Sequence, residues 1–426
     1  MRYIELPENI ETKIFVLDNG AINAVPEVLD TAFPDRKIQI VADGNTWQVA
    51  GEKIARLCSE KNPGSYPPII LPANPKPHPD YSLSQELAEK FADDCVPLAV
   101  GSGVINDLVK CASNLKNLRY ACFATAASVD GYTASGGAMA VDSQKKTVPC
   151  PAPYALIADT AIMQTAPAEM MASGYADLMS KVTGGADWIL ADELGIEKIA
   201  PEIWSLVQDD LRDNLADPND LEKLFLGLAA TGYAMQMYHD SRPASGAEHL
   251  CSHVWEMEHL ALDGEEISHG FKVGIGVLAV AQLQEFVINT PLETAQSMAK
   301  APLDKTARAE EIAQLLIKGC YGNTIADLAL NKMPFGEDMS ERRKLIFAHW
   351  ENLQSRMKQQ LLPSETLRKM LKKANVPTRF EEIGLTAEQY YHGIKTAQLI
   401  RKRYTVLDML YEAGLLDAAI QTIKNI

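Results

Sequence analysis

One change of pattern along the chain constrains its fold most. Short β-rich runs fill the first 165 residues and are absent after Thr165. Amphipathic helical stretches separate these runs, which lie at 14–17, 38–42, 69–71, 98–100 and 120–124. Strand and helix in this alternation are typical of a parallel sheet with helices on both faces. Long helical patterns follow at 168–190, 219–239, 246–262, 271–288, 308–319, 339–361 and 386–415.

The chain has 426 residues, which is more than one compact domain usually holds. We therefore predict an α/β dinucleotide-binding domain over 1–165 and an all-helical domain over 166–426, with the site in the cleft between them. Segments 138–141 and 147–149 suggest a hairpin added to the sheet. The proline-rich segment 63–79 suggests an extended surface loop. Two helix starts are also expected, at Ser340 and at the capping pair of Thr386 and Gln389.

Charge and cysteine content exclude several classes of protein. Forty basic against 56 acidic residues give a net charge of −16, which argues against a nucleic-acid or membrane-surface protein. No apolar leader and no long uninterrupted apolar stretch is present, so neither a signal peptide nor membrane insertion is expected. Seven scattered cysteines without a CxxC pair indicate reduced thiols and a cytoplasmic protein.

Two glycine-containing segments follow predicted strands. The first has the sequence VPLAVGSGVINDLVK, at 96–110, and passes from a strand through Gly101, Ser102 and Gly103 into a helix. A helix N-terminus of this kind suits a pyrophosphate, although a plain tight turn fits the residues as well. The second has the sequence ATAASVDGYTASGGAM, at 124–139, where small side chains would let a flat ring or sugar approach the backbone. Its Asp130 is either a ligand-binding carboxylate or an Asx-turn residue.

A third group of residues suggests a metal site. Five of only eight histidines lie between 239 and 269. His249 and His253 are four residues apart on a predicted helix and share one face. His269 follows, just before Gly270 and another apolar helical stretch. One carboxylate, Asp177, with two histidines of this group makes a three-ligand divalent site. Histidines at this spacing are also often surface or capping residues, which is the interpretation we prefer for His239 and His259.

Taken together, these segments resemble the sn-glycerol-1-phosphate dehydrogenases, closest to their bacterial arabinose-operon type. This family belongs to the superfamily of iron-containing alcohol dehydrogenases and dehydroquinate synthases. The segments that carry the resemblance stand in family order over about residues 40–280; they are AVGSGVINDLVK, TAASVDGYT, SGYADLMSKVTGGADW, SRPASGAEHLCSH and SHGFKVG. The resemblance implies a Rossmann-like domain followed by a helical domain, and reduction of dihydroxyacetone phosphate by NAD(H) or NADP(H).

The resemblance also implies roles for individual residues. The metal ligands would be Asp177, His249 and His269, holding zinc, nickel or iron. Asp130, Asp177 and His253 would contact the substrate, with Asp130 and His253 taking part in catalysis. The dinucleotide would lie along a set of backbone and small residues: Asp43, Gly101, Ser102, Gly103, Val104, Ile105, Thr125, Ala126, Ala127 and Ser128. An acidic Asp43 at the ribose would favour NAD. A homodimer or larger homo-oligomer is also expected.

The substrate phosphate requires cations, for which Arg242, Lys181 and Lys272 are candidates, Arg242 first. The sequence departs from the family pattern at two positions. Ala134 stands where the family has a serine that helps to bind the dinucleotide, and the nearest serine, Ser135, comes one residue later. Ala176 replaces a glycine of the family. These departures keep open a dehydrogenase of glycerol or of another polyol phosphate. A dehydroquinate synthase-like cyclase and a non-catalytic protein on a decayed enzyme fold are further alternatives.

Overall fold

A computed structural model describes residues 1–61, 64–141, 144–319, 321 and 324–424. Two compact units divide the chain. The first, the α/β unit, comprises Met1–Gly174 and Asp213–Asp240; the second, the helical unit, comprises Tyr175–Arg212 and Ser241–Ile426. The helices α7 (Ala168–Glu193) and α9 (Leu211–Asn214) each cross from one unit into the other.

The α/β unit is built on a six-stranded sheet with the order β1-β8-β5-β4-β2-β3, in which every described pair is parallel. Its strands are β1 (Ile14–Asp18), β2 (Lys37–Asp43), β3 (Ile69–Leu71), β4 (Cys95–Gly101), β5 (Ala121–Ala124) and β8 (Ala155–Asp159). From β2 the chain crosses outward to β3, whereas from β4 it crosses the other way to β5. The direction of winding therefore reverses between β2 and β4, and ligands of open α/β sheets bind at the carboxyl ends of such strands.

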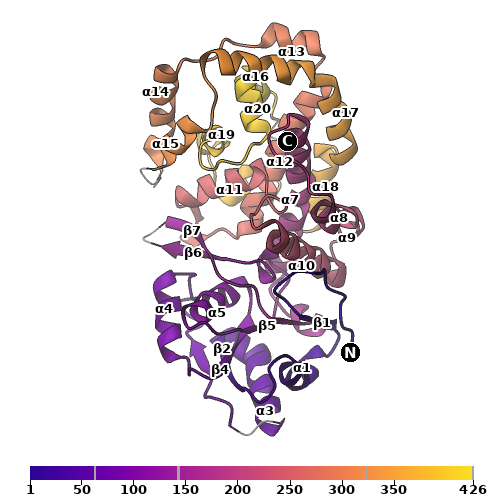
Figure 1. Cartoon of the computed structure of the whole chain (residues 1–426), viewed down its shortest axis with the longest axis vertical. Coiled ribbons are helices and arrows are strands. Elements are labelled where there is room, and N and C mark those ends of the chain that lie inside the picture. The colour runs from indigo at the N-terminus through magenta and orange to yellow at the C-terminus, as the bar shows by residue number, and fades with distance from the viewer. Residues whose placement is uncertain (62–63, 142–143, 320, 322–323, 425–426) are drawn as a thin grey trace. The chain divides into compact units, whose positions relative to one another are not determined.

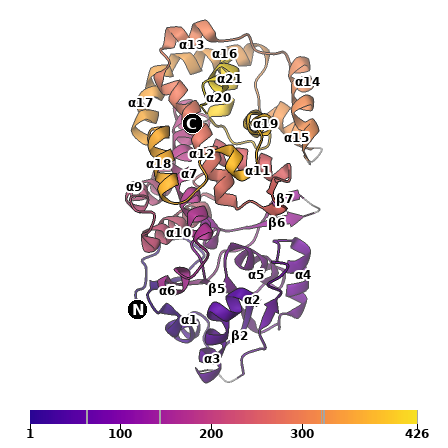
Figure 2. The same ribbon diagram turned by 180° about the vertical axis from the view of Figure 1, so that it is seen from behind.

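Helices cover both faces of this sheet, as its alternating sequence predicted. Figures 1 and 2 show α4 and α5 together on one side of the sheet and α1 and α3 together on the other. The helices and short turns of the unit are the 3₁₀ turn η1 (Ala21–Ala24), α1 (Val25–Ala32), α2 (Gly44–Thr46), the π-helical turn η2 (Trp47–Gly51), α3 (Glu52–Lys61), α4 (Tyr81–Lys90), α5 (Gly103–Leu115), the 3₁₀ turn η3 (Asp130–Tyr132), α6 (Thr160–Met163) and α10 (Leu221–Tyr238). Both faces of β4 are buried, which explains its continuous apolar sequence.

Three features of the α/β unit differ from the sequence prediction. The strand β8 was not predicted, because its five residues, ALIAD, show no alternation. The hairpin of β6 (Gly137–Val141) and β7 (Gln144–Val148) forms a separate two-stranded sheet and does not extend the main one; residues 142–143 of its predicted turn lie outside the described residues.

The third difference is α10, which lies beyond the predicted boundary at 165 and nevertheless packs into the α/β unit. Its Phe225 ring contacts the rings of Phe15 and Tyr132, at 6.0 and 5.5 Å between centroids. The hydroxyl of Thr133 donates to the carbonyl of Ala229 at 2.8 Å. These contacts show why the two units are not simply consecutive along the chain.

The helical unit has its core around α11, α12, α17, α19 and α20. Its helices are α8 (Pro201–Gln208), α11 (Ala247–Met257), α12 (His269–Asn289), α13 (Leu292–Met298), α14 (Lys305–Leu315), α15 (Thr324–Asn331), α16 (Gly336–Ala348), α17 (Trp350–Gln360), α18 (Ser364–Lys373), α19 (Ala387–Ala397), α20 (Val406–Ala413) and α21 (Leu416–Gln421). A short hairpin, β9 (Ala261–Leu262) and β10 (Glu265–Glu266), connects α11 to α12. By length and composition α12 is apolar enough to cross a membrane, but 78% of its most apolar stretch is buried inside the protein.

Two long helices expected from the sequence are each divided. The pattern at 339–361 forms α16 and α17, and Ser340 lies inside α16 rather than at its start. The pattern at 386–415 forms α19 and α20, because Thr405 and Asp408 make a second capping box between them. The predicted capping box of Thr386 and Gln389 is confirmed at the start of α19.

Candidate dinucleotide site and metal centre

The predicted dinucleotide residues lie at the carboxyl edge of the sheet. Gly101 ends β4, Asp43 ends β2 and Thr125 follows β5. The amide of Thr125 donates to the carbonyl of Gly101 at 3.1 Å, which ties the ends of β4 and β5 together. The structure therefore brings both sequence segments to the place where the winding of the sheet reverses.

Glycine is needed at position 101 for a steric reason. A Cβ atom there would lie 2.6 Å from the Cβ of Ile105, on the first turn of α5. The close approach keeps the start of α5 against the end of β4, with Ser102 as the residue before the helix. Because the first amides of a helix lack partners within the helix, Gly103, Val104 and Ile105 present donors and the positive end of the dipole at this edge.

The second small-residue segment is held by close packing against two helices. A Cβ on Gly174, in α7, would lie 2.0 Å from the carbonyl oxygen of Ala127. Beside it, the hydroxyl of Ser173 donates to the carbonyl of Ser128 at 3.3 Å. A Cβ on Gly232, in α10, would lie 2.9 Å from the carbonyl oxygen of Asp130. Small residues on α7 and α10 thus fix the segment that carries Asp130.

Below this segment, the buried ammonium of Lys110 organises the following loop. Its Nζ donates to the carbonyls of Gly131, Ala134 and Gly136 at 3.0, 2.9 and 3.0 Å. The same atom lies 3.2 Å from Oδ1 of Asp107. Lys110 was not singled out in the sequence, although its place in the first motif was visible. A lysine fully inside a protein requires such a set of acceptors.

Asp43 caps the short helix that follows β2. Its Oδ1 accepts from the amides of Asn45 and Thr46 at 2.8 and 2.9 Å, and the Thr46 hydroxyl accepts from the Asp43 amide. Both bonds from the helix use Oδ1, so Oδ2 takes no part in the cap. The sequence places Asp43 at the end of a predicted strand, and the structure adds that Asp43 is also the N-cap of α2.

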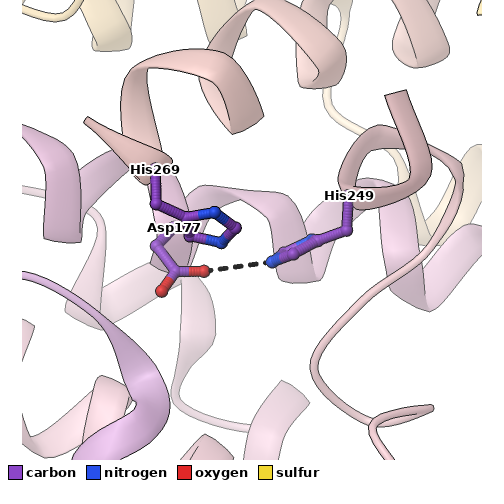
Figure 3. A group of neighbouring side chains, drawn as sticks. All are labelled: Asp177, His249 and His269. Atoms are coloured by element: carbon purple, nitrogen blue, oxygen red, sulfur yellow. Dashed lines mark ion pairs between the residues drawn. The ribbon is translucent and has the colours of Figure 1, made fainter. Parts of the chain in front are cut away.

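The three predicted metal ligands converge in the helical unit. Asp177 comes from α7, His249 from α11 and His269 from the first residue of α12, and Figure 3 shows the three side chains facing one another. One ligand atom from each residue lies within 4.8 Å of the others. His249 Nε2 is 3.3 Å from Asp177 Oδ1. Asp177 and His249 are buried and His269 is half-buried.

This donor set fits a divalent ion. A carboxylate oxygen and two imidazole nitrogens are ligands for zinc, nickel and iron, with bonds of about 2.0–2.2 Å to zinc. Tetrahedral bonds of that length place neighbouring ligand atoms about 3.4 Å apart, close to the separation of His249 Nε2 and Asp177 Oδ1. Three protein ligands leave a coordination position for water or substrate, as in catalytic rather than structural sites.

Charged and hydrogen-bonding neighbours keep the two carboxylates of the site, Asp177 and Glu248, ionised. Burial alone would raise the pKa of Asp177, but the Lys181 ammonium, 3.0 Å from Oδ1, and His249 lower this pKa well below its ordinary range. Burial would likewise raise the pKa of Glu248, while hydrogen bonding to His249 lowers it. Glu248 Oε1 lies 3.0 Å from His249 Nδ1, so Nε2 is the nitrogen that faces Asp177. A carboxylate behind a histidine ligand is a usual companion of metal sites.

A second carboxylate, Glu256 on α11, joins the remaining parts of the site. Its Oε1 lies 3.1 Å from His269 Nδ1 and 3.1 Å from Lys272 Nζ. Its Oε2 lies 3.1 Å from His253 Nδ1. Neither Glu248 nor Glu256 was identified from the sequence. The available signals were that Glu248 directly precedes His249 and that Glu256 lies one helical turn after His253.

The three candidate phosphate cations have different surroundings. Arg242 has 1% of its surface exposed, and its guanidinium donates to the main-chain carbonyls of Tyr404 and Asp187, both at 3.0 Å. Its Nε lies 3.2 Å from Glu197. These contacts hold segments of the helical unit together, so we assign Arg242 a structural role in place of the predicted substrate contact. Lys181 and Lys272 are buried, Lys181 against the candidate ligand Asp177 and Lys272 against Glu256, which also contacts His269.

The other two clustered histidines end secondary-structure elements. His239 and His259 have positive φ angles of 57° and 56°, and His239 is the C-cap of α10. Both positions follow helices, where a left-handed residue commonly terminates the helix. Asp130 lies in η3 of the α/β unit, and the triad lies in the helical unit.

Comparison with known proteins shows the family of this chain. Residues 16–167 match the model of the iron-containing alcohol dehydrogenases. The chain is 27% identical over 419 residues to the glycerol-1-phosphate dehydrogenase (NAD(P)+) of Bacillus licheniformis, covering 96% of this chain and 90% of that one. It is 32% identical over 326 residues to the enzyme of the same name from Halalkalibacterium halodurans, covering 72% of this chain and 79% of that one. The chain belongs to the glycerol-1-phosphate dehydrogenase family.

Solved structures show that this member of the glycerol-1-phosphate dehydrogenase family has the expected fold. It resembles the crystal structure of glycerol dehydrogenase from Schizosaccharomyces pombe with a TM-score of 0.58 and 15% identity, over 96% of this chain and 89% of that one. It resembles the NADH-dependent butanol dehydrogenase A of Thermotoga maritima with a TM-score of 0.54 and 15% identity, over 97% and 98%. The predicted fold class, a parallel-sheet domain with a helical domain, is confirmed.

Proposed function

We propose that this chain is a metal-dependent enzyme that uses NAD(P)H to reduce dihydroxyacetone phosphate to sn-glycerol 1-phosphate, reversibly. One observation carries the proposal: Asp177, His249 and His269 converge within 4.8 Å in a chain whose relatives are named glycerol-1-phosphate dehydrogenases. The names of the relatives indicate the reaction, and the three side chains would hold the metal ion that polarises the carbonyl group of the substrate.

In this proposal Asp177, His249 and His269 hold one divalent ion. Zinc fits the donor set best, and nickel and iron accept the same ligands. The bound ion supplies a Lewis acid for the substrate carbonyl, and the nicotinamide supplies the hydride. Glu248 orients His249 by accepting from its Nδ1, and Lys181 keeps Asp177 ionised although the carboxylate is buried.

The dinucleotide is assigned to the carboxyl edge of the sheet. The pyrophosphate would bind the amides from Gly101 through Ile105, at the start of α5. The segment from Thr125 through Ser128 would line the nicotinamide half. Asp43 would accept from the adenosine ribose through Oδ2. Because a 2′-phosphate would be repelled by this carboxylate, we expect NADH to be preferred over NADPH.

Asp130, Asp177 and His253 are proposed as the substrate contacts. The Nδ1 of His253 faces Glu256, so Nε2 is the atom from which His253 would deliver a proton to the reduced oxygen. Lys272 and Lys181 supply positive charge for the phosphorylated substrate beside the triad. We further propose that the enzyme is cytoplasmic and works as a homodimer or larger homo-oligomer. Light scattering of the purified protein measures its oligomeric state.

A substrate panel tests the proposal. We expect zinc-loaded protein to oxidise NADH rapidly with dihydroxyacetone phosphate and only weakly with unphosphorylated dihydroxyacetone. Equal rates with both would indicate a polyol dehydrogenase on the same fold, the possibility left open by Ala134 and Ala176. Phosphate release without net NADH oxidation, from a phosphorylated cyclase substrate, would instead indicate a dehydroquinate synthase-like reaction.

A further inference from the structure

One carboxylate serves two histidines in the helical unit. Glu256 uses Oε1 toward Nδ1 of His269 and Oε2 toward Nδ1 of His253, both at 3.1 Å. The two imidazole rings lie 6.0 Å apart between centroids with 28° between their planes. Lys272 Nζ lies 3.1 Å from Oε1 of the same carboxylate. The Glu256 side chain is 10% exposed, so water competes little for these bonds.

The carboxylate of Glu256 determines which nitrogen of each imidazole ring carries the proton. An ionised carboxylate has only acceptors, and a neutral imidazole carries its proton on either Nδ1 or Nε2. With each Glu256 oxygen facing an Nδ1, the favourable arrangement has both Nδ1 atoms protonated. We propose that Glu256 is a positioning residue that fixes the Nδ1-protonated tautomer of His253 and His269 at the same time. This inference rests on the proposed function for the roles of those two histidines.

The fixed tautomers have one consequence at each ring. In His269 the lone pair is on Nε2, which is the form that binds a metal ion through that atom. In His253 the same tautomer makes Nε2 the atom that gains and loses the transferred proton. Glu256 would therefore align a metal ligand and a proton carrier through one side chain, and Lys272 would supply the counter-charge to that carboxylate.

The variant Glu256→Gln separates this role from general packing. An amide of the same size offers one acceptor and one donor group in place of two acceptors. It can support the Nδ1-protonated form of one histidine only, and the other ring must turn or carry its proton on Nε2. The control is Glu265→Gln, which makes the same change of charge at an exposed residue of β10.

The direct measurement is the tautomer of each histidine by nitrogen NMR, with and without zinc, above the ordinary histidine pKa of about 6.5. We expect Nδ1–H on His253 and His269 in the wild type and in Glu265→Gln, and loss of one of them in Glu256→Gln. The zinc Kd of Glu256→Gln should rise about 10–100-fold. The wild-type spectrum tests the proposal even if the variant does not fold.

Two results would overturn it: Nε2–H on either histidine in the wild type, or unchanged tautomers and zinc Kd in Glu256→Gln. These readouts require no turnover, so they distinguish this inference from the proposed function. Fixed tautomers in a protein that does not reduce dihydroxyacetone phosphate would contradict the function alone. Turnover with unfixed tautomers would contradict the role of Glu256 alone.

Discussion

The two candidate sites of this molecule are built in different ways. The candidate dinucleotide site is made of main-chain groups from short continuous segments. Its backbone can pack this closely only because residues such as Gly101 have no side chain. The metal site uses side chains from three helices, Asp177, His249 and His269, each supported by a further charged residue. The first site should therefore be sensitive to added atoms, and the second to removed ones.

The largest expected effect comes from removing a ligand. His249→Ala deletes one of three donors, and we expect bound zinc to be lost and kcat/KM for dihydroxyacetone phosphate to fall at least about 100-fold. Metal analysis and NADH oxidation measure this. The control is His259→Asn, an exposed histidine whose left-handed conformation asparagine tolerates. A variant that loses zinc and keeps its activity would show that the triad is not catalytic.

Next in size is the buried cation of the α/β unit. Lys110→Met leaves the carbonyls of Gly131, Ala134 and Gly136 without their donor, and we expect the free energy of unfolding to fall by about 3 kcal/mol. Urea unfolding measures the loss, with the exposed Lys90→Met as control. Unchanged stability together with unchanged activity would mean that Lys110 does not organise the loop after Asp130.

A smaller and more selective effect is expected from one added methyl group. Gly101→Ala places a Cβ against Ile105 at 2.6 Å, and overpacking of this kind costs about 1–3 kcal/mol. Because the strain falls on the first turn of α5, the substitution should raise KM for NADH about tenfold. Zinc content should stay at the wild-type level, because the triad lies on other helices. Loss of zinc with normal NADH binding would reverse the assignment of the two sites.

The smallest effect concerns the pH dependence of stability in the helical unit. Burial raises the pKa of Glu412 to about 7, against the opposing hydrogen bond from Tyr404. The folded protein therefore binds more protons than the unfolded chain between about pH 4.5 and 7. This contribution to stability is present below pH 4.5 and is lost as the pH rises through 7. Glu412→Gln should flatten this part of the curve of unfolding free energy against pH, leaving zinc and NADH binding unchanged.

The way each site is built explains how much of it the sequence predicted. Gly101, Ser102 and Gly103 follow a strand directly, so a local pattern sufficed to place them at the end of β4. Local spacing related His249 only to His253. Asp177 and His269 were candidates from their residue types, but only the family resemblance joined them with His249 into one ligand set, because contact between α7, α11 and α12 is a property of tertiary packing.

Residues that act through others were missed for the same reason. Glu248 and Glu256 are ordinary helix carboxylates in the sequence, and only the fold shows which histidine nitrogens they face. Arg242 was misjudged because a turn next to a proline gave no sign that its partners are the carbonyls of Tyr404 and Asp187. The apolar helix α10 gave no sign of which unit it would enter.

The most direct test of the central claim is a metal titration of the wild-type enzyme. Protein freed of metal by chelation should not oxidise NADH with dihydroxyacetone phosphate, and activity should rise with added zinc to a plateau at one equivalent per chain. His249→Ala should show no recovery at any equivalence. Full activity of the wild type without metal would contradict the account.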